Sequence, residues 1–93
     1  MSLKIVRMLS GEDVLCECED KGDHLEFIDS VVIVPTQNQS VQFVPYSPFT
    51  NPKDPLKINK DMIVFVTDPT SMFANQHKQM FGGIVTPDTQ IVV

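Results

Sequence analysis

The first third of the chain alternates apolar and polar side chains through three short runs. The runs cover residues 4–9, 14–19 and 24–34, and turns at Ser10-Gly11-Glu12-Asp13 and Asp20-Lys21-Gly22-Asp23 separate them. Alternation with a period of two is typical of a half-buried β-strand, and glycine provides the positive φ angle that a tight turn requires. The pattern therefore predicts a bent antiparallel meander with one buried face.

The third run is long for one flat strand, because the apolar stretch 31–34 extends it to Pro35. A bulge or bend near Asp29-Ser30 would allow this strand to serve two parts of a barrel wall. The second run has one apolar face and one largely acidic face, as in an antiparallel strand with a solvated side. The residues expected to face the core are Val14, Cys16 and Cys18, and those expected to face outward are Leu15, Glu17 and Glu19.

Strand character resumes at 41–44, after a polar tip, and the proline-rich segment 45–55 that follows is expected to form an ordered loop or an irregular edge. Two more apolar runs, 56–58 and 62–66, flank the polar triplet Asn59-Lys60-Asp61. An apolar run, a polar turn and a second apolar run are typical of a β-hairpin. The sequence thus predicts that these two strands pair with each other.

A helix start is indicated at Asp68-Pro69-Thr70-Ser71, because Asp, Thr and Ser are good caps and proline is tolerated in the first turn. Apolar residues follow at near-helical spacing, and Gly82-Gly83 is expected to end the helix. The prediction is one helix over about 69–81, followed by a β-like tail at 83–93.

Together these elements predict a single mainly-β domain over 1–93. The barrel, over about 1–67, is expected to be small, strongly bent, antiparallel and five-stranded, with one short C-terminal helix. The net charge is −5 and the isoelectric point is near 4.7. These values argue against a protein that binds duplex DNA through a basic stripe, so any nucleic-acid site has to be local and helped by stacking or backbone contacts.

The beginning of the chain is charged and lacks the apolar run of a signal peptide, and no stretch approaches the length of a membrane span. The expected location is the reducing cytoplasm, with Cys16 and Cys18 as free thiols. Two cysteines on one strand face are most simply small core residues, since zinc usually takes four Cys or His ligands and both histidines are remote in sequence. No nucleophile has a neighbouring His and Asp, so no catalytic residue, metal, cofactor or small-molecule substrate is expected.

The opening stretch resembles the first motif of the Sm and Sm-like proteins. Gly11 matches the turn glycine, Val14 the apolar position after it, and His24-Leu25-Glu26 the loop triplet that leads into the third strand. The segment 58–63 lies where the second family motif has its Arg-Gly turn. The predicted fold is accordingly an Sm-like (SH3-like) barrel.

Nearly the whole chain looks like the small Sm-like proteins encoded by marine phages, in particular cyanophages. The segments that carry this likeness are Met-Leu-Ser-Gly-Glu-Asp-Val at 8–14, Ile-Val-Pro at 33–35, Phe-Val-Pro-Tyr-Ser-Pro-Phe at 43–49 and Gln-Met-Phe-Gly-Gly-Ile-Val-Thr-Pro at 79–87. The resemblance implies expression in the cytoplasm of the phage's host.

The resemblance also implies a cyclic homo-oligomer, from pentamer to heptamer, that assembles edge to edge and holds RNA or another single-stranded nucleic acid at its pore loops. Assembly is expected between the strand around 41–44 of one copy and the strand 62–66 of the next. The implied function is RNA or DNA processing in phage or host, without enzymatic activity. The candidate nucleic-acid-binding residues are His24, Glu26, Asn59, Lys60 and Asp61.

Two departures from the family pattern leave a second function open. Glu26 stands where the family has asparagine, and an ionised carboxylate only accepts hydrogen bonds and repels phosphate. Asn59-Lys60 replaces Arg-Gly, so the planar guanidinium that stacks on a base is missing. The alternative is a protein-interaction or assembly module of the same fold that no longer binds nucleic acid.

Several features each have a functional and a structural interpretation. His24 is either a stacking residue or a solvated turn residue, and Lys60 either part of a ring of ammonium groups or an ordinary surface lysine. The aromatic residues among the prolines (Phe43, Tyr46 and Phe49) form either a stacking platform or docking edge or, as favoured here, a small apolar core that seals the barrel beside the helix. His77-Lys78 is expected to lie on the polar face of the helix.

Overall fold

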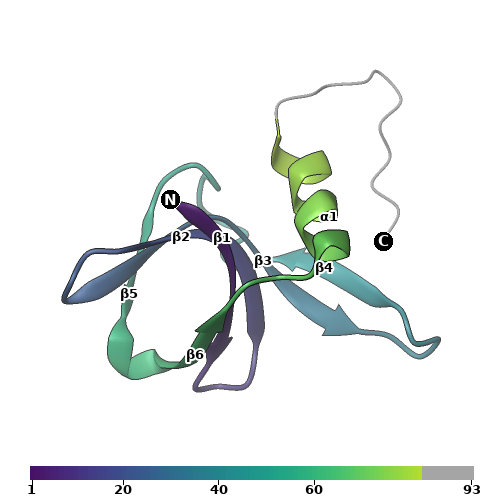
Figure 1. Cartoon of the computed structure of the whole chain (residues 1–93), viewed down its shortest axis with the longest axis horizontal. Helices are drawn as coiled ribbons and strands as arrows, with labels where there is room; N and C mark the ends of the chain where they lie inside the picture. Colours follow the sequence, from purple (N-terminus) through teal and green to yellow (C-terminus); the bar gives the residue numbers. More distant parts are fainter. Residues whose placement is uncertain (83–93) are drawn as a thin grey trace.

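The computed structural model describes residues 1–82, and the expected tail at 83–93 lies outside this range. This part of the chain forms six β-strands, a short 3₁₀ turn (η1) and one α-helix, arranged as Figure 1 shows. The elements are β1 (Ser2–Met8), β2 (Asp13–Asp20), β3 (His24–Pro35), β4 (Val41–Pro45), β5 (Leu56–Asn59), η1 (Lys60–Met62), β6 (Ile63–Thr67) and α1 (Ser71–Phe81). The mainly-β fold with one short C-terminal helix is therefore confirmed, although the sheet has six strands where five were expected.

All strand pairs are antiparallel, in the order β4-β3-β2-β1-β6, and β5 pairs separately with β3. Over residues 1–82 the sheet is unclosed, with β4 and β6 at the two ends of this strand order. The predicted hairpin between 56–58 and 62–66 is wrong, because β5 pairs with β3 whereas β6 pairs with β1. The polar triplet Asn59-Lys60-Asp61 does not reverse the chain onto itself. It leads through η1 from one side of the sheet to the other.

The predicted irregularity at Asp29-Ser30 is confirmed as a β-bulge. Leu15 lies opposite Val31 and Glu17 lies opposite Ile28, so two residues of β3 face Cys16 alone. Asp29 has a φ angle of 54°, in the left-handed region that Asp tolerates better than most residues. The bulge divides β3 into a first half that pairs with β5 and a second half that pairs with β4.

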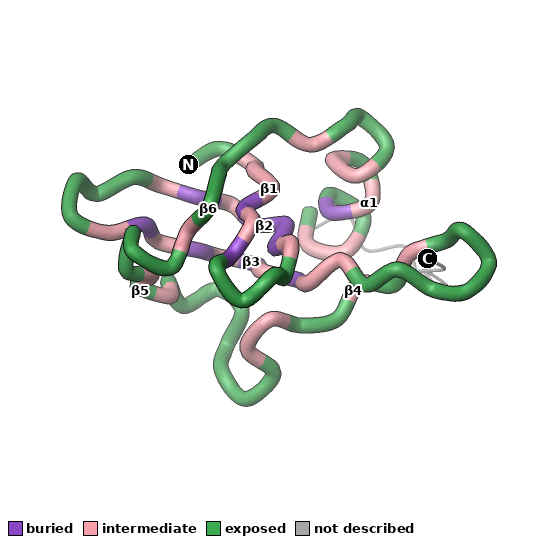
Figure 2. The backbone as a smooth tube through the Cα atoms, turned by 90° about the horizontal axis from the view of Figure 1, so that it is seen from below, coloured by how far each residue is buried: buried purple, intermediate pink, exposed green. Residues whose placement is uncertain are grey.

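The hydrophobic core lies between the meander of β1, β2 and β3 and the side chains from β5, β6 and Tyr46 that pack against it. Phe27 is completely buried at its centre, and Tyr46 packs against it with ring centroids 6.3 Å apart. Figure 2 shows the buried positions concentrated on β1, β2 and the first half of β3. The cluster comprises Val6, Met8, Val14, Cys16, Cys18, Leu25 and Phe27, with Tyr46, Leu56, Ile58 and Ile63 partly buried against it. Both cysteines are core residues, as expected.

Helix α1 lies over the other face of the sheet. Thr70 caps it by accepting a hydrogen bond from the Phe73 N–H at 3.4 Å. Leu15, which was expected to face solvent, is fully buried because it points away from Val14 and Cys16, to the face that α1 covers. His77 is also buried, so the prediction that it lies on a polar helix face is wrong.

The three aromatic residues among the prolines do not form one cluster. Tyr46 joins the core, Phe43 meets Phe73 of α1 edge to face at 5.7 Å, and Phe49 is 97% exposed. The predicted apolar seal is therefore made by Tyr46 and Phe43, on opposite faces of the sheet.

Candidate nucleic-acid interface

The structure brings the two predicted binding segments together at one end of the sheet. In the register of β3 with β5, His24 lies opposite Asn59 and Glu26 lies opposite Lys57. The turn before β3 and the turn after β5 therefore share one edge, although more than thirty positions of sequence separate them. We call residues 19–26 and 57–61 the charged loop cluster. It contains all five predicted site residues (His24, Glu26, Asn59, Lys60 and Asp61).

His24 is largely enclosed by carboxylates. Its Nδ1 lies 2.5 Å from Oδ1 of Asp23 and its Nε2 lies 3.5 Å from Oε2 of Glu26. Only 16% of the side chain is exposed, so little of it is available to a ligand. The hydrogen bond and charge of His24 hold the pKa of the exposed Asp23 carboxyl below its ordinary value.

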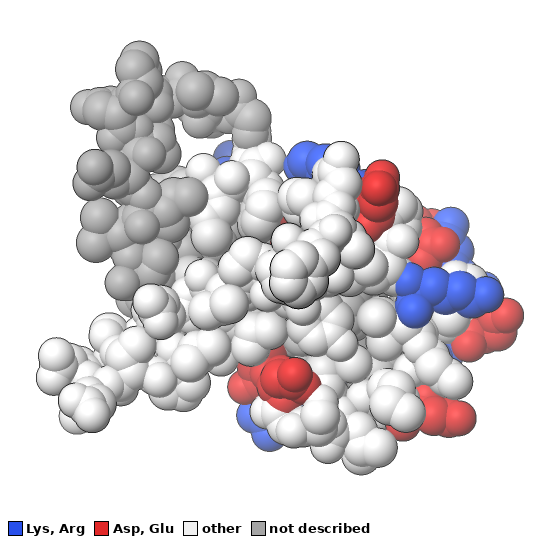
Figure 3. Space-filling view, turned by 180° about the vertical axis from the view of Figure 1, so that it is seen from behind, with Lys and Arg blue, Asp and Glu red and all other residues white. Residues whose placement is uncertain are grey.

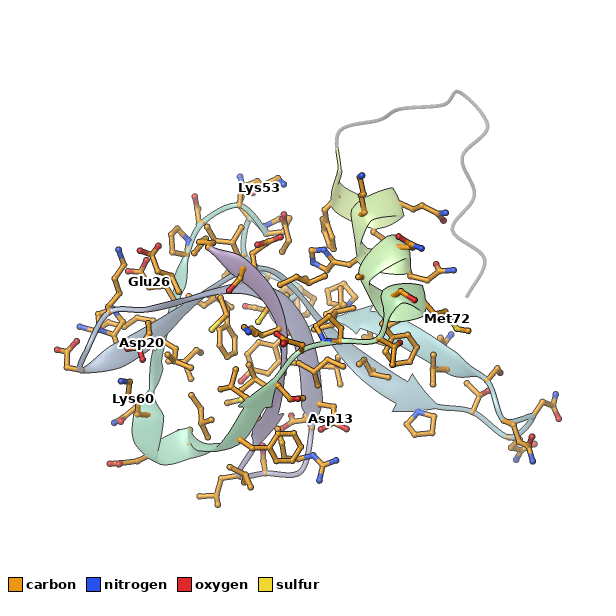
Figure 4. All side chains as sticks on the ribbon, in the orientation of Figure 1. Asp13, Asp20, Glu26, Lys53, Lys60 and Met72 are labelled. Atoms are coloured by element: carbon orange, nitrogen blue, oxygen red, sulfur yellow. The ribbon has the colours of Figure 1, made fainter. Side chains whose placement is uncertain are left out.

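Lys60 is held by a residue that the sequence analysis did not include in the site. Its Nζ lies 2.9 Å from Oδ1 of Asp20, the last residue of β2. The same oxygen accepts a hydrogen bond of 2.8 Å from the Gly22 N–H. The Lys60 ammonium, followed by the Gly22 amide, lowers the pKa of the Asp20 carboxyl from its ordinary value. Figure 4 shows Asp20 and Lys60 close together at this end of the molecule.

Asn59 and Asp61 shape the turn that carries Lys60. The Asn59 side-chain oxygen caps η1 by accepting the Asp61 N–H at 3.1 Å. Its amide NH₂ group donates no hydrogen bond to another described residue, so this group is available as a donor to a ligand. Asp61 is exposed, and it adds a further carboxylate to the loop.

Carboxylates outnumber lysines in the charged loop cluster. Besides the Lys60–Asp20 pair, a second lysine is paired, because Nζ of Lys21 lies 3.3 Å from Oε2 of Glu19. Both lysine pairs are exposed to solvent to a large extent, so each contributes little to stability. The arrangement offers a half-buried imidazole, an amide donor and a tethered ammonium group. It does not offer a basic surface.

A second polar cluster, which the sequence did not reveal, centres on the buried Asp29. Its N–H donates to Pro52 O, its carbonyl accepts from His77 Nε2–H at 2.8 Å, and its Oδ2 lies 2.7 Å from Lys53 Nζ. The His77 ring also packs on Phe81, with centroids 4.8 Å apart. These contacts join the bulge, the proline-rich loop and α1. Their only sequence signal was the predicted bulge.

Neither thiol is accessible for chemistry. Cys16 is fully buried and Cys18 nearly so, and both are free. The neighbouring Cys18 sulfur and burial together raise the pKa of the Cys16 thiol. Within residues 1–82, no group of three or more His, Cys, Asp or Glu side chains is arranged to hold a metal ion. No helix of this same part has the length and apolar character needed to cross a membrane.

No protein-family model matches the sequence, and no curated protein is significantly similar to it. The geometry of the loops and edges is therefore the basis for assigning a function.

Proposed function

We propose that this chain is an Sm-like subunit that assembles edge to edge into a cyclic homo-oligomer and binds single-stranded RNA or DNA at the charged loop cluster. The observation that carries the proposal is the register of β3 with β5, which sets His24 beside Asn59 and next to the turn that bears Lys60. Separate loops that converge on one edge are what a shared binding site requires. The role would be non-enzymatic, in nucleic-acid processing of a phage or its host, in a reducing cytoplasm that suits the two free thiols.

The two ends of the unclosed sheet support assembly. Among residues 1–82, strands β4 and β6 each have a neighbouring strand on one side only, so each leaves backbone N–H and C=O groups that no described strand pairs with. Both also carry exposed apolar side chains: Val44 on β4, and Val64, Phe65 and Val66 on β6. Because the two ends differ, pairing between them is head to tail, and such pairing closes into a ring when the rotation between copies allows it.

The chemistry of the loops supports single-stranded nucleic acid over duplex. An imidazole such as that of His24 can stack on a base that reaches it, and the Asn59 amide can donate to a base edge. Around a ring, each Lys60 would be repeated, so that local ammonium groups reach phosphates in spite of the negative total charge. Duplex binding would need a continuous basic surface, and the carboxylates among residues 19–26 interrupt one.

Oligonucleotide titration of the full chain tests this proposal. Fluorescence anisotropy with labelled oligo-uridine and oligo-deoxythymidine should show salt-dependent binding at micromolar protein. Lys60→Ala should weaken binding, because it removes the ammonium group that would reach a phosphate. Lys78→Ala, on the exposed side of α1, is the matched control and should bind like wild type. The absence of binding by wild type, or identical binding by the Lys60 variant, would overturn the proposal.

A second candidate function is an assembly module of the same fold that does not bind nucleic acid. The specific observation in its favour is that carboxylates already occupy Lys60 and both ring nitrogens of His24. Mass measurement of the native assembly with and without oligo-uridine separates the two functions. A defined oligomer whose mass does not change with oligo-uridine supports the module, and a protein–nucleic-acid complex supports the first proposal.

A further inference from the structure

The turn between β2 and β3 aims the Asp20 carboxylate at Lys60. Oδ1 of Asp20 accepts the Gly22 N–H, which is an Asx-type contact across two residues. Gly22 adopts a φ angle of 96°, which permits this turn and which other residues rarely adopt. The carboxylate is therefore already fixed by the turn when Lys60 reaches it from the end of β5, and no loop rearrangement is needed to form the ion pair.

An anionic ligand at Lys60 has to replace this carboxylate. The ligand and the carboxylate both carry negative charge. Replacing the carboxylate therefore gives the ligand less electrostatic binding free energy than an unpaired ammonium group would. The displaced carboxylate also remains nearby, because the Gly22 N–H still holds it. Uncharged contacts, such as stacking on His24 or a hydrogen bond from Asn59, do not face this competition.

We propose that Asp20 is a specificity-determining residue that competes with phosphate for Lys60 and so makes the site select single strands by their bases. This inference rests on the proposed nucleic-acid function and assigns it a residue that the sequence analysis did not identify. The expected ligand is therefore a single-stranded nucleic acid with accessible bases. A polyanion without bases is not expected to bind at this site.

Salt dependence distinguishes this role from a purely structural one. When a phosphate displaces Asp20, one counterion is released from the phosphate, but the freed carboxylate attracts another. Wild-type binding should therefore depend weakly on salt. Asp20→Asn removes the competitor and should steepen the slope of log K against log salt by about 0.7 for each Lys60–phosphate contact.

The Asp20→Asn variant is suited to the test because asparagine retains the side-chain oxygen that accepts the Gly22 N–H. The matched control is Asp13→Asn, which removes the same charge from an ion-paired aspartate at the opposite end of β2, roughly 23 Å away along an extended strand. Figure 4 shows the two aspartates at separate places on the molecule. Inorganic polyphosphate serves as the polyanion without bases, beside oligo-uridine.

The expected result is that Asp20→Asn binds oligo-uridine about two- to five-fold more tightly, the range for an exposed ion pair. It should also gain measurable affinity for polyphosphate, whereas Asp13→Asn should do neither. In a double-mutant cycle, the gain should disappear in a Lys60→Ala background, since Asp20 acts through Lys60.

Four outcomes would overturn the inference. An equal gain from Asp20→Asn with and without Lys60, or an equal gain from Asp13→Asn, means that total charge alone is responsible; the proposed function then stands while this inference fails. An unchanged Asp20 pKa in Lys60→Ala, followed by carboxyl NMR, shows that the ion pair does not form in solution. If none of the variants binds any oligonucleotide, the proposed function and this inference fail together.

Discussion

The two ends of β3 lie in contrasting surroundings. Its first half enters the charged loop cluster, where carboxylates and lysines alternate within a few residues. Its second half belongs to residues 30–52, which contain no Asp, Glu, Lys, Arg or His; we call this segment the neutral arm. Figure 3 shows the β3–β4 hairpin of this segment projecting from the molecule as a surface without blue or red, while most of the charged side chains lie on the other side of this view.

The difference in charge between the two halves of β3 suits them to two different roles, self-association and ligand binding. Interface cores are depleted in charged residues. The neutral arm combines this property with the β4 edge, which no strand of the described part of the chain pairs with, and with exposed apolar side chains such as Val44. The charged loop cluster has the opposite character and suits a solvated ligand. The Asp29 bulge is the boundary, and it turns the two halves of β3 toward different partners. The β4 edge of the proposed interface and the proposed ligand site are therefore expected at opposite ends of β3.

The largest expected effect comes from the core that supports both ends. Phe27→Ala should lower the free energy of unfolding by about 3–5 kcal/mol, because it leaves a cavity at a completely buried site. Phe49→Ala, at a 97% exposed position of the neutral arm, should change stability by less than about 0.5 kcal/mol. Urea denaturation followed by circular dichroism measures both. If Phe27→Ala does not fold, Phe27→Leu should give a smaller graded loss. A large effect of Phe49 would mean that the arm has a core of its own.

The next effect concerns the boundary between the two ends. His77→Phe should lower the free energy of unfolding by about 1–3 kcal/mol, since the buried Asp29 carbonyl loses its donor while the aromatic ring is retained. Amide hydrogen exchange should be faster in His77→Phe than in wild type, and this acceleration should be larger in α1 than in β1 or β2. Lys78→Ala, one position further along the helix and exposed, is the control and should leave both measurements unchanged. Equal exchange rates in wild type and His77→Phe would show that the hydrogen bond from His77 to the Asp29 carbonyl does not stabilise the position of α1.

A charge in the neutral arm should separate assembly from ligand binding. Val44→Lys places an ammonium group on the free β4 edge and should raise the dissociation constant of the oligomer at least about tenfold, because edge lysines oppose strand pairing. Size-exclusion chromatography with light scattering measures this at several concentrations. Glu12→Lys makes a larger change in total charge in the turn between β1 and β2 and should leave assembly intact. Assembly that survives Val44→Lys would assign self-association to another surface.

The smallest effect is the response of the charged loop cluster to acid. Asp20 and Asp23 have lowered pKa values in the folded chain, mainly from Lys60 and His24 respectively. Their contribution to stability is complete above the ordinary aspartate pKa and is lost as the pH falls through the lowered folded values. Both side chains are exposed, so the loss should be small. Carboxyl NMR across the acidic range should show both titrating below an aspartate in an unstructured peptide. Titration at the ordinary aspartate pKa would contradict the two pairings.

Local sequence was sufficient for the features that depend on local chemistry. Alternation with a period of two predicted the meander and the buried face of β2, because successive side chains of a strand point to opposite sides. The length of the run at 24–34 predicted the bulge at Asp29-Ser30 before any pairing was known. The cap at Thr70 and the helix end near Gly82 also follow from residue types with clear local preferences.

Pairing between distant segments could not be read in the same way. The runs 56–58 and 62–66 have the pattern of a hairpin, yet each finds a better partner in a strand far away in sequence, β3 and β1 respectively. His77 is polar by residue type, but it is buried because the bulge presents a carbonyl group to it. Leu15 was expected to face outward, but α1 covers that side of the sheet.

The candidate site also has some features that local sequence predicts and others that depend on tertiary structure. By itself, the sequence determined which turns carry His24 and Lys60, since glycine and polar residues mark turns through their own backbone preferences. Only the tertiary structure decided that these turns meet and that Asp20 holds Lys60. The physical reason is that strand register and an exposed ion pair depend on segments brought together by the shared core around Phe27, and no local preference encodes such contacts.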